Sequence, residues 1–268
     1  MIIQTGMRTD IPAFYSKWFL NRIKDGYVCV RNPYNPKQVT KYSLSPEVVD
    51  LIAFCTKNPL PMLPFLEELK PYGQYWFVTI TPYGRDIEPN VPDKETVMEG
   101  LKKLSDVVGV DSIGWRYDPI FIDKKHSVEW HISEFEKMAE NLAGYTKTCV
   151  ISFIDIYKKV ERNFPEAKSV RAEDMAMLVK AFVKIASKYG IWYEHEVLTP
   201  VLGTPLAELD YDEIFQTLSK DRQEGNTKEK GLFLCIVREG CHRKLNTENR
   251  VRTVIERKQW FVTVRHIF

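Results

Sequence analysis

Charged side chains recur in this chain directly after short apolar runs that are typical of β-strands. The cations in these positions are Arg8, Arg31, Lys57 and Arg116, and the carboxylates are Asp10, Asp118 and Asp155. Arginine binds carboxylates and phosphates through two parallel hydrogen bonds, and lysine adds a point charge. Because the cations outnumber the aspartates, the pattern favours a site for an anionic ligand.

Uncharged polar side chains complete the same clusters. Asn32 and Asn58 each precede a proline, which holds them extended and would fix their amides as directional hydrogen-bonding groups. Hydroxyls stand at further strand ends, on Thr79, Thr81 and Ser152. Any single arginine–aspartate pair can also be an ion pair that serves stability alone. Six clusters together favour a ligand site, because a network of ion pairs that serves stability alone does not require every strand to end in polar residues.

The elements that would position these residues alternate between strands and helices. Apolar runs predict parallel strands near residues 2–5, 27–30, 51–55, 75–80, 113–116, 149–154 and 191–196. A 3.6-residue period predicts helices over 10–23, 94–108, 127–143 and 173–189, and prolines limit 59–70 to a short helix. Parallel strands aim their carboxyl ends the same way, so the polar clusters would meet at one mouth of a TIM-like (β/α) barrel or partial barrel.

Length and composition fit an enzyme-sized α/β chain. We read residues 1–200 as one barrel-like domain and 201–268 as a divergent or partly ordered tail. The net charge of +2 gives no sign of nucleic acid or membranes as partners. No apolar stretch approaches the ~20 residues of a membrane span, and the N-terminus lacks the pattern of a secretory signal, so we expect a cytoplasmic protein. The oligomeric state is not indicated.

Metal-binding patterns are weak. Cys29, Cys55 and Cys149 fall within predicted strands, where a free thiol packs as a small hydrophobic group. Cys235 and Cys241, with five residues between them, are the weak metal candidates. The chain contains no P-loop, dinucleotide-binding glycine turn, nucleophile elbow or zinc-protease helix, and the sequence indicates no catalytic residue.

An ordered series of motifs resembles a bacterial family catalogued as domain of unknown function 1848, from Met1 to about Ile191. The motifs are Arg8-Thr9-Asp10-Ile11-Pro12-Ala13-Phe14-Tyr15, Val30-Arg31-Asn32-Pro33, Thr56-Lys57-Asn58-Pro59, Thr79-Ile80-Thr81, Trp115-Arg116-Tyr117-Asp118-Pro119 and Ile151-Ser152-Phe153-Ile154-Asp155-Ile156-Tyr157. The resemblance implies a radical-SAM-like barrel that uses a [4Fe–4S] cluster and S-adenosylmethionine. In the family, a cysteine cluster near the C-terminal end would hold the iron.

The chain departs from this pattern after Ile191, where it has only Cys235 and Cys241. A cubane cluster that binds a cofactor at its fourth iron needs three thiolates. We therefore expect this chain to bind neither cluster nor S-adenosylmethionine, and its cluster-dependent activity to be impaired. The cations would hold the carboxylate or phosphate of an anionic ligand, and the aspartates would orient them or accept ribose hydroxyls. The alternatives are a cluster-free barrel that binds a nucleotide or anionic metabolite, and a nonfunctional truncated or frame-shifted product.

Overall fold

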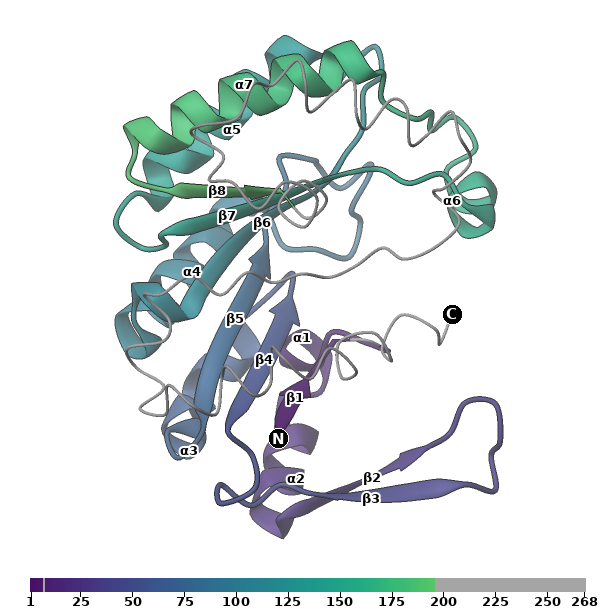
Figure 1. Ribbon diagram of the computed structural model, residues 1–268, viewed down its shortest axis with the longest axis vertical. Coiled ribbons are helices and arrows are strands. Elements are labelled where there is room, and N and C mark those ends of the chain that lie inside the picture. The colour runs from purple at the N-terminus through teal and green to yellow at the C-terminus, as the bar shows by residue number, and fades with distance from the viewer. Residues whose placement is uncertain (7, 196–268) are drawn as a thin grey trace. The chain divides into compact units, whose positions relative to one another are not determined.

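A computed structural model describes residues 1–6 and 8–195, which form two compact units. The N-terminal unit comprises Met1–Thr79 and Tyr83–Gly114, and the C-terminal unit comprises Ile80–Pro82 and residues 115–195. Figure 1 shows the strands and helices of both. No helix among the described residues is long and apolar enough to span a bilayer.

The N-terminal unit contains three parallel strands in the order β1-β4-β5. These are β1 (Ile2–Gln4), β4 (Leu51–Thr56) and β5 (Gly73–Thr79). The helical segments are α1 (Ile11–Phe14), α2 (Ser16–Asp25), the 3-10 helix η1 (Leu60–Phe65), α3 (Leu66–Leu69), α4 (Lys94–Val108) and the 3-10 helix η2 (Val110–Ser112). The predicted helix over 94–108 is confirmed, and that over 10–23 is divided at Tyr15.

The burial of side chains alternates along β4 and shows which face of this sheet is packed. Every second side chain, including that of Phe54, is buried, and those between are half-buried. The Phe54 ring stacks on Trp76 of β5, with 4.0 Å between ring centroids, and meets Phe19 of α2 edge-on. One face of the strands is thereby packed against α2, and the parallel register brings the carboxyl ends of β1 and β4 side by side.

The run at residues 27–30 is not part of the parallel sheet, and this prediction was wrong. The strand β2 (Tyr27–Arg31) pairs antiparallel with β3 (Val39–Ser43), and the two form a separate hairpin. Figure 1 shows this hairpin apart from the parallel strands of the same unit. The sequence signal for β3 was present, since Val39–Ser43 is rich in β-forming residues and a turn with two prolines precedes it.

The C-terminal unit contains β6 (Ile113–Ile120, whose first two residues belong to the other unit), β7 (Thr148–Phe153) and β8 (Trp192–His195), in that order. Its helices are α5 (Val128–Leu142), α6 (Lys158–Asn163) and α7 (Ala172–Lys188). The strands β7 and β8 are parallel. The predicted helices near 127–143 and 173–189 are confirmed, and Ser127 caps α5 by accepting a hydrogen bond from the Trp130 amide at 3.2 Å. The helix α6 was not predicted.

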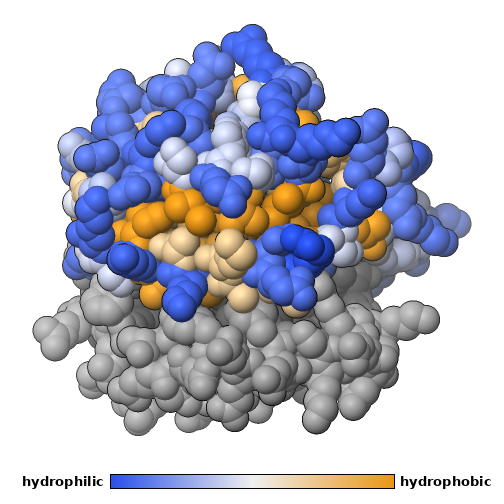
Figure 2. Space-filling view, turned by 90° about the horizontal axis from the view of Figure 1, so that it is seen from above, coloured by the Kyte–Doolittle hydropathy of each residue, from blue (hydrophilic) through white to orange (hydrophobic). Residues whose placement is uncertain are grey.

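Aromatic rings form the core of the C-terminal unit. Phe135 of α5 stacks on Phe182 of α7, with 3.9 Å between ring centroids, and on Trp115 of β6 at 4.9 Å. Tyr117 of β6 meets both phenylalanines edge-on. These contacts place α5 and α7 over one face of β6. Figure 2, seen from above Figure 1, shows hydrophilic residues over much of the surface of the described residues and an apolar band among them.

One polar chain crosses this aromatic core. The Tyr117 hydroxyl lies 2.8 Å from His131 Nδ1, and His131 Nε2 lies 2.8 Å from the carbonyl oxygen of Phe121. A carbonyl can only accept, so Nε2 carries the proton and Nδ1 accepts from the hydroxyl. Burial lowers the pKa of His131 to about 4, because the charged imidazolium would lose its hydration. His131 is therefore a neutral, hydrogen-bonded core residue.

The coarse prediction of a mixed α/β fold with mostly parallel strands is confirmed. The described residues do not show a closed TIM-like barrel. The division at residue 200 and the tail over 201–268 lie outside the described residues, so both stay predictions.

Acid should destabilise the protein through His131. Its folded-state pKa of about 4 lies below the ordinary 6.5, so the unfolded chain takes up the proton first as the pH falls. The free energy of unfolding should therefore drop between pH 6.5 and 4, by about 3 kcal/mol from this group. Urea unfolding of the parent and of His131→Asn, which cannot titrate, measures the difference at each pH. The same pH slope in both proteins would refute this assignment.

Candidate functional site

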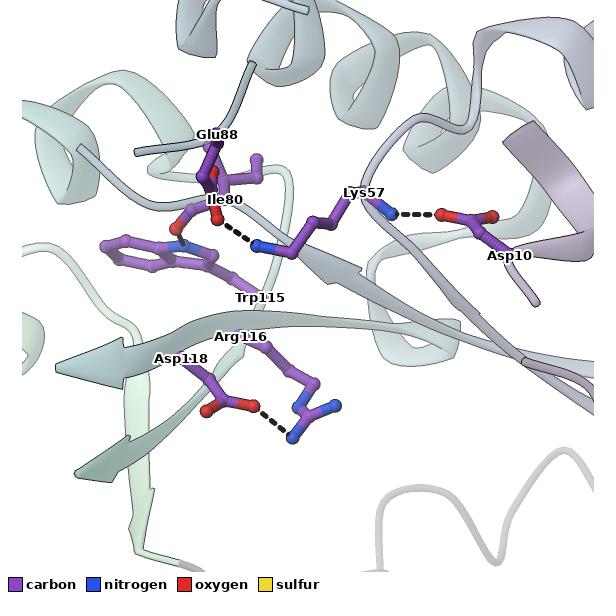
Figure 3. A network of polar contacts seen from close by, with 7 residues as sticks. All are labelled: Asp10, Lys57, Ile80, Glu88, Trp115, Arg116 and Asp118. Atoms are coloured by element: carbon purple, nitrogen blue, oxygen red, sulfur yellow. Dashed lines mark hydrogen bonds and ion pairs between the residues drawn. The ribbon is translucent and has the colours of Figure 1, made fainter. Parts of the chain in front are cut away.

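The carboxylate of Asp10 joins the segments that follow β1 and β4. Its Oδ1 accepts a hydrogen bond from the Ala13 amide at 2.9 Å and caps α1, and its Oδ2 accepts from the Lys57 amide at 2.7 Å. Figure 3 shows the second contact. Pro12 in the first turn of α1 suits a helix start, because its ring sets the helical φ angle and its missing N–H needs no partner. Asp10 therefore positions the site, and main-chain donors occupy both of its oxygens.

Lys57 meets a carboxylate that sequence reasoning did not single out. Its Nζ forms an ion pair with Glu88 Oε1, and the two side chains are 36% and 15% exposed. Glu88 stands in the loop after β5, and a turn in which its amide donates to the Gly84 carbonyl at 2.9 Å holds it there. The loop has no periodic pattern, so only the tertiary fold reveals the partner. Glu88 neutralises one of the four predicted cations.

Arg8 and Arg31 come together although 23 positions separate them. Nη2 of Arg8 donates to the main-chain carbonyl oxygen of Arg31 at 2.9 Å. Both residues are exposed. Within residues 1–6 and 8–195, neither guanidinium pairs with a carboxylate. The hairpin thus lies beside the segment after β1, even though it is not a strand of the sheet.

The two predicted asparagines stabilise turns. Asn32 Oδ1 accepts from the Tyr34 amide at 2.9 Å, and its Nδ2 donates to Gln38 Oε1 at 2.7 Å. Asn58 Oδ1 accepts from the Leu60 amide at 3.2 Å and starts η1. Asparagine makes this kind of turn readily because its short amide reaches the main chain two residues on. A role for either amide in ligand binding stays a prediction.

Arg116 and Asp118 form a compact ion pair in the C-terminal unit. The pair lies on the face of β6 opposite Trp115 and Tyr117, because side chains two apart in a strand share a face. The distance from Arg116 Nη2 to Asp118 Oδ2 is 2.5 Å, and the side chains are 14% and 23% exposed (Figure 3). The positive charge of Arg116 is therefore compensated locally.

The remaining predicted residues are less closely grouped. Thr79 ends β5 in the N-terminal unit and is buried. Thr81 is buried beside β6, since the amide of its neighbour Ile80 donates to the Arg116 carbonyl at 2.9 Å. Ser152 lies within β7 and Asp155 is exposed two residues beyond its end. Among the described residues, no polar contact joins Ser152 or Asp155 to the Arg116–Asp118 pair.

The described cysteines do not fit an iron–sulfur cluster. Cys29 is exposed on β2, Cys55 is half-buried in β4, and Cys149 is buried in β7. In the described part of the chain, no three histidine, cysteine, aspartate or glutamate side chains are grouped to hold a metal ion. Three thiolates must converge on a [4Fe–4S] cluster, and the described cysteines form no such group. Cys235 and Cys241 lie outside the described residues.

Removing the Asp10 carboxylate should loosen the ends of β1 and β4. Asp10→Ala leaves two main-chain amides without their acceptor and should cost about 1–3 kcal/mol of unfolding free energy. Asp10→Asn retains one acceptor oxygen and should cost less. The matched control is Asp93→Ala, because Asp93 precedes α4 without a side-chain capping bond and should change stability by less than about 0.5 kcal/mol. Equal losses in Asp10→Ala and Asp93→Ala would contradict the bridging role.

Comparison with curated proteins finds no relative that matches this chain. A family model does match, and it extends over residues 2–195, which is well over half of the sequence. Its span covers the segments that carry Arg8, Asp10, Lys57 and Arg116. The chain belongs to the family described as domain of unknown function (DUF1848).

Proposed function

We propose that this protein binds an anionic small molecule where β1 and β4 end in the N-terminal unit, with Arg8 and Arg31 as the anion-binding side chains. The contact between Arg8 and the Arg31 carbonyl carries the proposal, because it brings two guanidinium-bearing residues of distant motifs to one place. Planar guanidinium groups recognise carboxylate and phosphate oxygens through paired hydrogen bonds. The ligand class is therefore a phosphate or carboxylate.

The charge balance of the cluster supports this ligand class. Three cations (Arg8, Arg31 and Lys57) stand against two carboxylates (Asp10 and Glu88), so one net positive charge is left. Asp10 is held by main-chain amides and Glu88 by Lys57, so neither neutralises an arginine. An anion that binds the two arginines supplies the missing counter-charge.

Lys57 gives the proposed site a further positive group that can contact the bound anion. Its ammonium is partly exposed and is held in place by Glu88 before any ligand arrives. A bound phosphate can share this ammonium, because a lysine ammonium has three donors and Glu88 Oε1 occupies one. Asp10 fixes the Lys57 main chain and so sets the direction from which the side chain starts.

Barrel closure and radical-SAM-like chemistry are the finer expectations from the family resemblance, and both stay predictions. The proposal needs neither a cluster nor S-adenosylmethionine. It corresponds to the cluster-free alternative, in which an α/β protein binds a nucleotide or an anionic metabolite. The misfit of Cys29, Cys55 and Cys149 to a cluster supports this choice.

Isothermal titration of the purified chain with ATP and with inorganic phosphate tests the proposal. Arg8→Ala should weaken the parent's binding of the anion by about tenfold or more, since a charge-assisted hydrogen bond is worth about 1.5–3 kcal/mol. Arg8→Lys keeps the charge but loses the planar fork, so its affinity should fall between the two. The control Lys103→Ala removes an exposed cation from α4 of the same unit and should have no effect.

Two outcomes would contradict this site. One is a parent chain that neither binds these anions nor gains thermal stability from them. The other is a loss of binding in Arg116→Ala with none in Arg8→Ala, which would move the site to the C-terminal unit. Thermal unfolding of each variant separates lost binding from lost fold.

The purified chain should lack the broad visible absorption of a [4Fe–4S] cluster after anaerobic reconstitution with iron and sulfide. Cys29, Cys55 and Cys149 are not grouped to hold a metal ion, so only Cys235 and Cys241 are left, and two thiolates are one short. Absorbance and iron analysis measure this directly. About four irons per chain, together with cleavage of S-adenosylmethionine, would contradict the prediction.

A further inference from the structure

The β2–β3 hairpin and its flanks carry positive charge only. Residues 26–46 contain three cations, Arg31, Lys37 and Lys41, and no aspartate or glutamate. The whole chain has a net charge of only +2, so this local excess is hidden in the overall composition. Among the described residues, none of the three forms an ion pair with a carboxylate. The hairpin is therefore a locally basic surface.

The register of the hairpin places two of the three cations on one face, and Lys37 lies in the turn. Arg31 stands opposite Val39 and Cys29 opposite Lys41, so Arg31 and Lys41 share one face with Tyr27. The Lys41 ammonium lies 3.9 Å from the centre of the Tyr27 ring. Val28 and Val30 lie on the other face. Every residue of β3 is exposed, so the described elements leave this strand uncovered.

Hydrogen bonds from its own side chains and main chain shape the turn of the hairpin. Asn32 accepts from the Tyr34 amide, Asn35 accepts from the Lys37 amide, and the Gln38 amide donates to the Asn35 carbonyl at 2.9 Å. Tyr34 stands within this turn with 71% of its surface exposed. The turn therefore presents an aromatic ring at the end of the hairpin.

We propose that the β2–β3 hairpin binds single-stranded nucleic acid. Lys37, Lys41 and Arg31 would contact phosphates of the backbone, and Tyr34 at the turn would stack on an unpaired base. Unspecific single-strand binders combine these two elements, because every base has a flat π-face and every nucleotide a phosphate. The charge of the surface is complementary to this polyanion over the whole hairpin.

Other occupants fit the hairpin less well. A second copy of the chain would bring the same unpaired cations together. Duplex DNA conceals its base faces and leaves the exposed ring of Tyr34 without a stacking partner. An acidic peptide would neutralise the lysines. It would leave the exposed Tyr34 ring unused, whereas a nucleic-acid base is flat and of the right size to stack on this ring. Single-stranded nucleic acid uses both the cations and the ring.

This inference goes beyond the proposed small-anion site and depends on different residues. The small-anion site requires Arg8, and the hairpin surface requires Lys37, Lys41 and Tyr34. Arg31 belongs to both and is left unchanged in the test. Arg8→Ala should therefore lose the small anion and retain most nucleic-acid binding, and changes at the lysines should do the reverse.

Fluorescence anisotropy with labelled oligo(dT) and oligo(U) of 15 nucleotides measures binding to the full chain between 25 and 200 mM KCl. The double variant Lys37→Glu/Lys41→Glu should bind at least tenfold more weakly at 50 mM. Its slope of log affinity against log salt should shrink by about 1.4, at about 0.7 per lost phosphate contact. Tyr34→Ala should weaken binding about five- to a hundredfold with an unchanged slope, as expected for lost stacking.

The matched control is Lys103→Glu, which makes the same charge change on α4 of the same unit. The inference is overturned if the parent does not bind the oligonucleotides, or if Lys103→Glu weakens binding as much as the double variant. Equal affinity for a duplex of the same length, with no effect of Tyr34→Ala, would also overturn it. Binding of a poly-glutamate peptide that oligo(dT) cannot displace would assign the hairpin to an acidic protein instead. Thermal unfolding confirms that each variant is folded.

Discussion

Asp10 holds the ends of β1 and β4 together through hydrogen bonds from two main-chain amides. A helix start and a strand end both leave amides without partners, and a buried or half-buried amide without an acceptor is costly. One carboxylate satisfies both. This constraint sets where α1 begins and where Lys57 leaves the sheet. The negative charge of Asp10 therefore serves to position the main chain.

The predicted excess of cations is reduced by pairing in both units. Glu88 neutralises Lys57 in the N-terminal unit, and Asp118 neutralises Arg116 in the C-terminal unit. Partly buried charges are retained in folded proteins when an opposite charge accompanies them, because unpaired burial loses hydration. Arg8 and Arg31 are exposed and do not require a partner for stability. This contrast is why the proposed ligand site centres on these two residues.

The hairpin and the core of the C-terminal unit illustrate two uses of aromatic residues. Trp115, Tyr117, Phe135 and Phe182 are fully buried and contact one another, either stacked or edge-on, so they contribute apolar burial and fix the α5–α7 layer. Tyr34 is exposed at the turn of the hairpin and contributes nothing comparable to the core. Its exposed ring is the group proposed to stack on a base.

Elements with local signals can be predicted from the amino-acid sequence alone. The α5 start follows from Ser127 as an N-cap and the α1 start from Asp10 and Pro12, because capping depends on residues within one turn. The 3.6-residue period of 94–108 was sufficient for α4. The strand runs of β1, β4 and β5 and the family assignment also follow from local motifs in a fixed order.

The partners of these elements depend on how distant parts of the chain pack. A β-type run such as Tyr27–Arg31 has the same local pattern in a parallel sheet and in a hairpin, and pairing with Val39–Ser43 decides between them. The pairing of Lys57 with Glu88 joins residues 31 positions apart in a loop without periodicity. The local charge of residues 26–46 is visible in the sequence, but its exposure on one face of a hairpin depends on register. Contacts between distant residues arise from packing of the whole unit, and no local pattern encodes them.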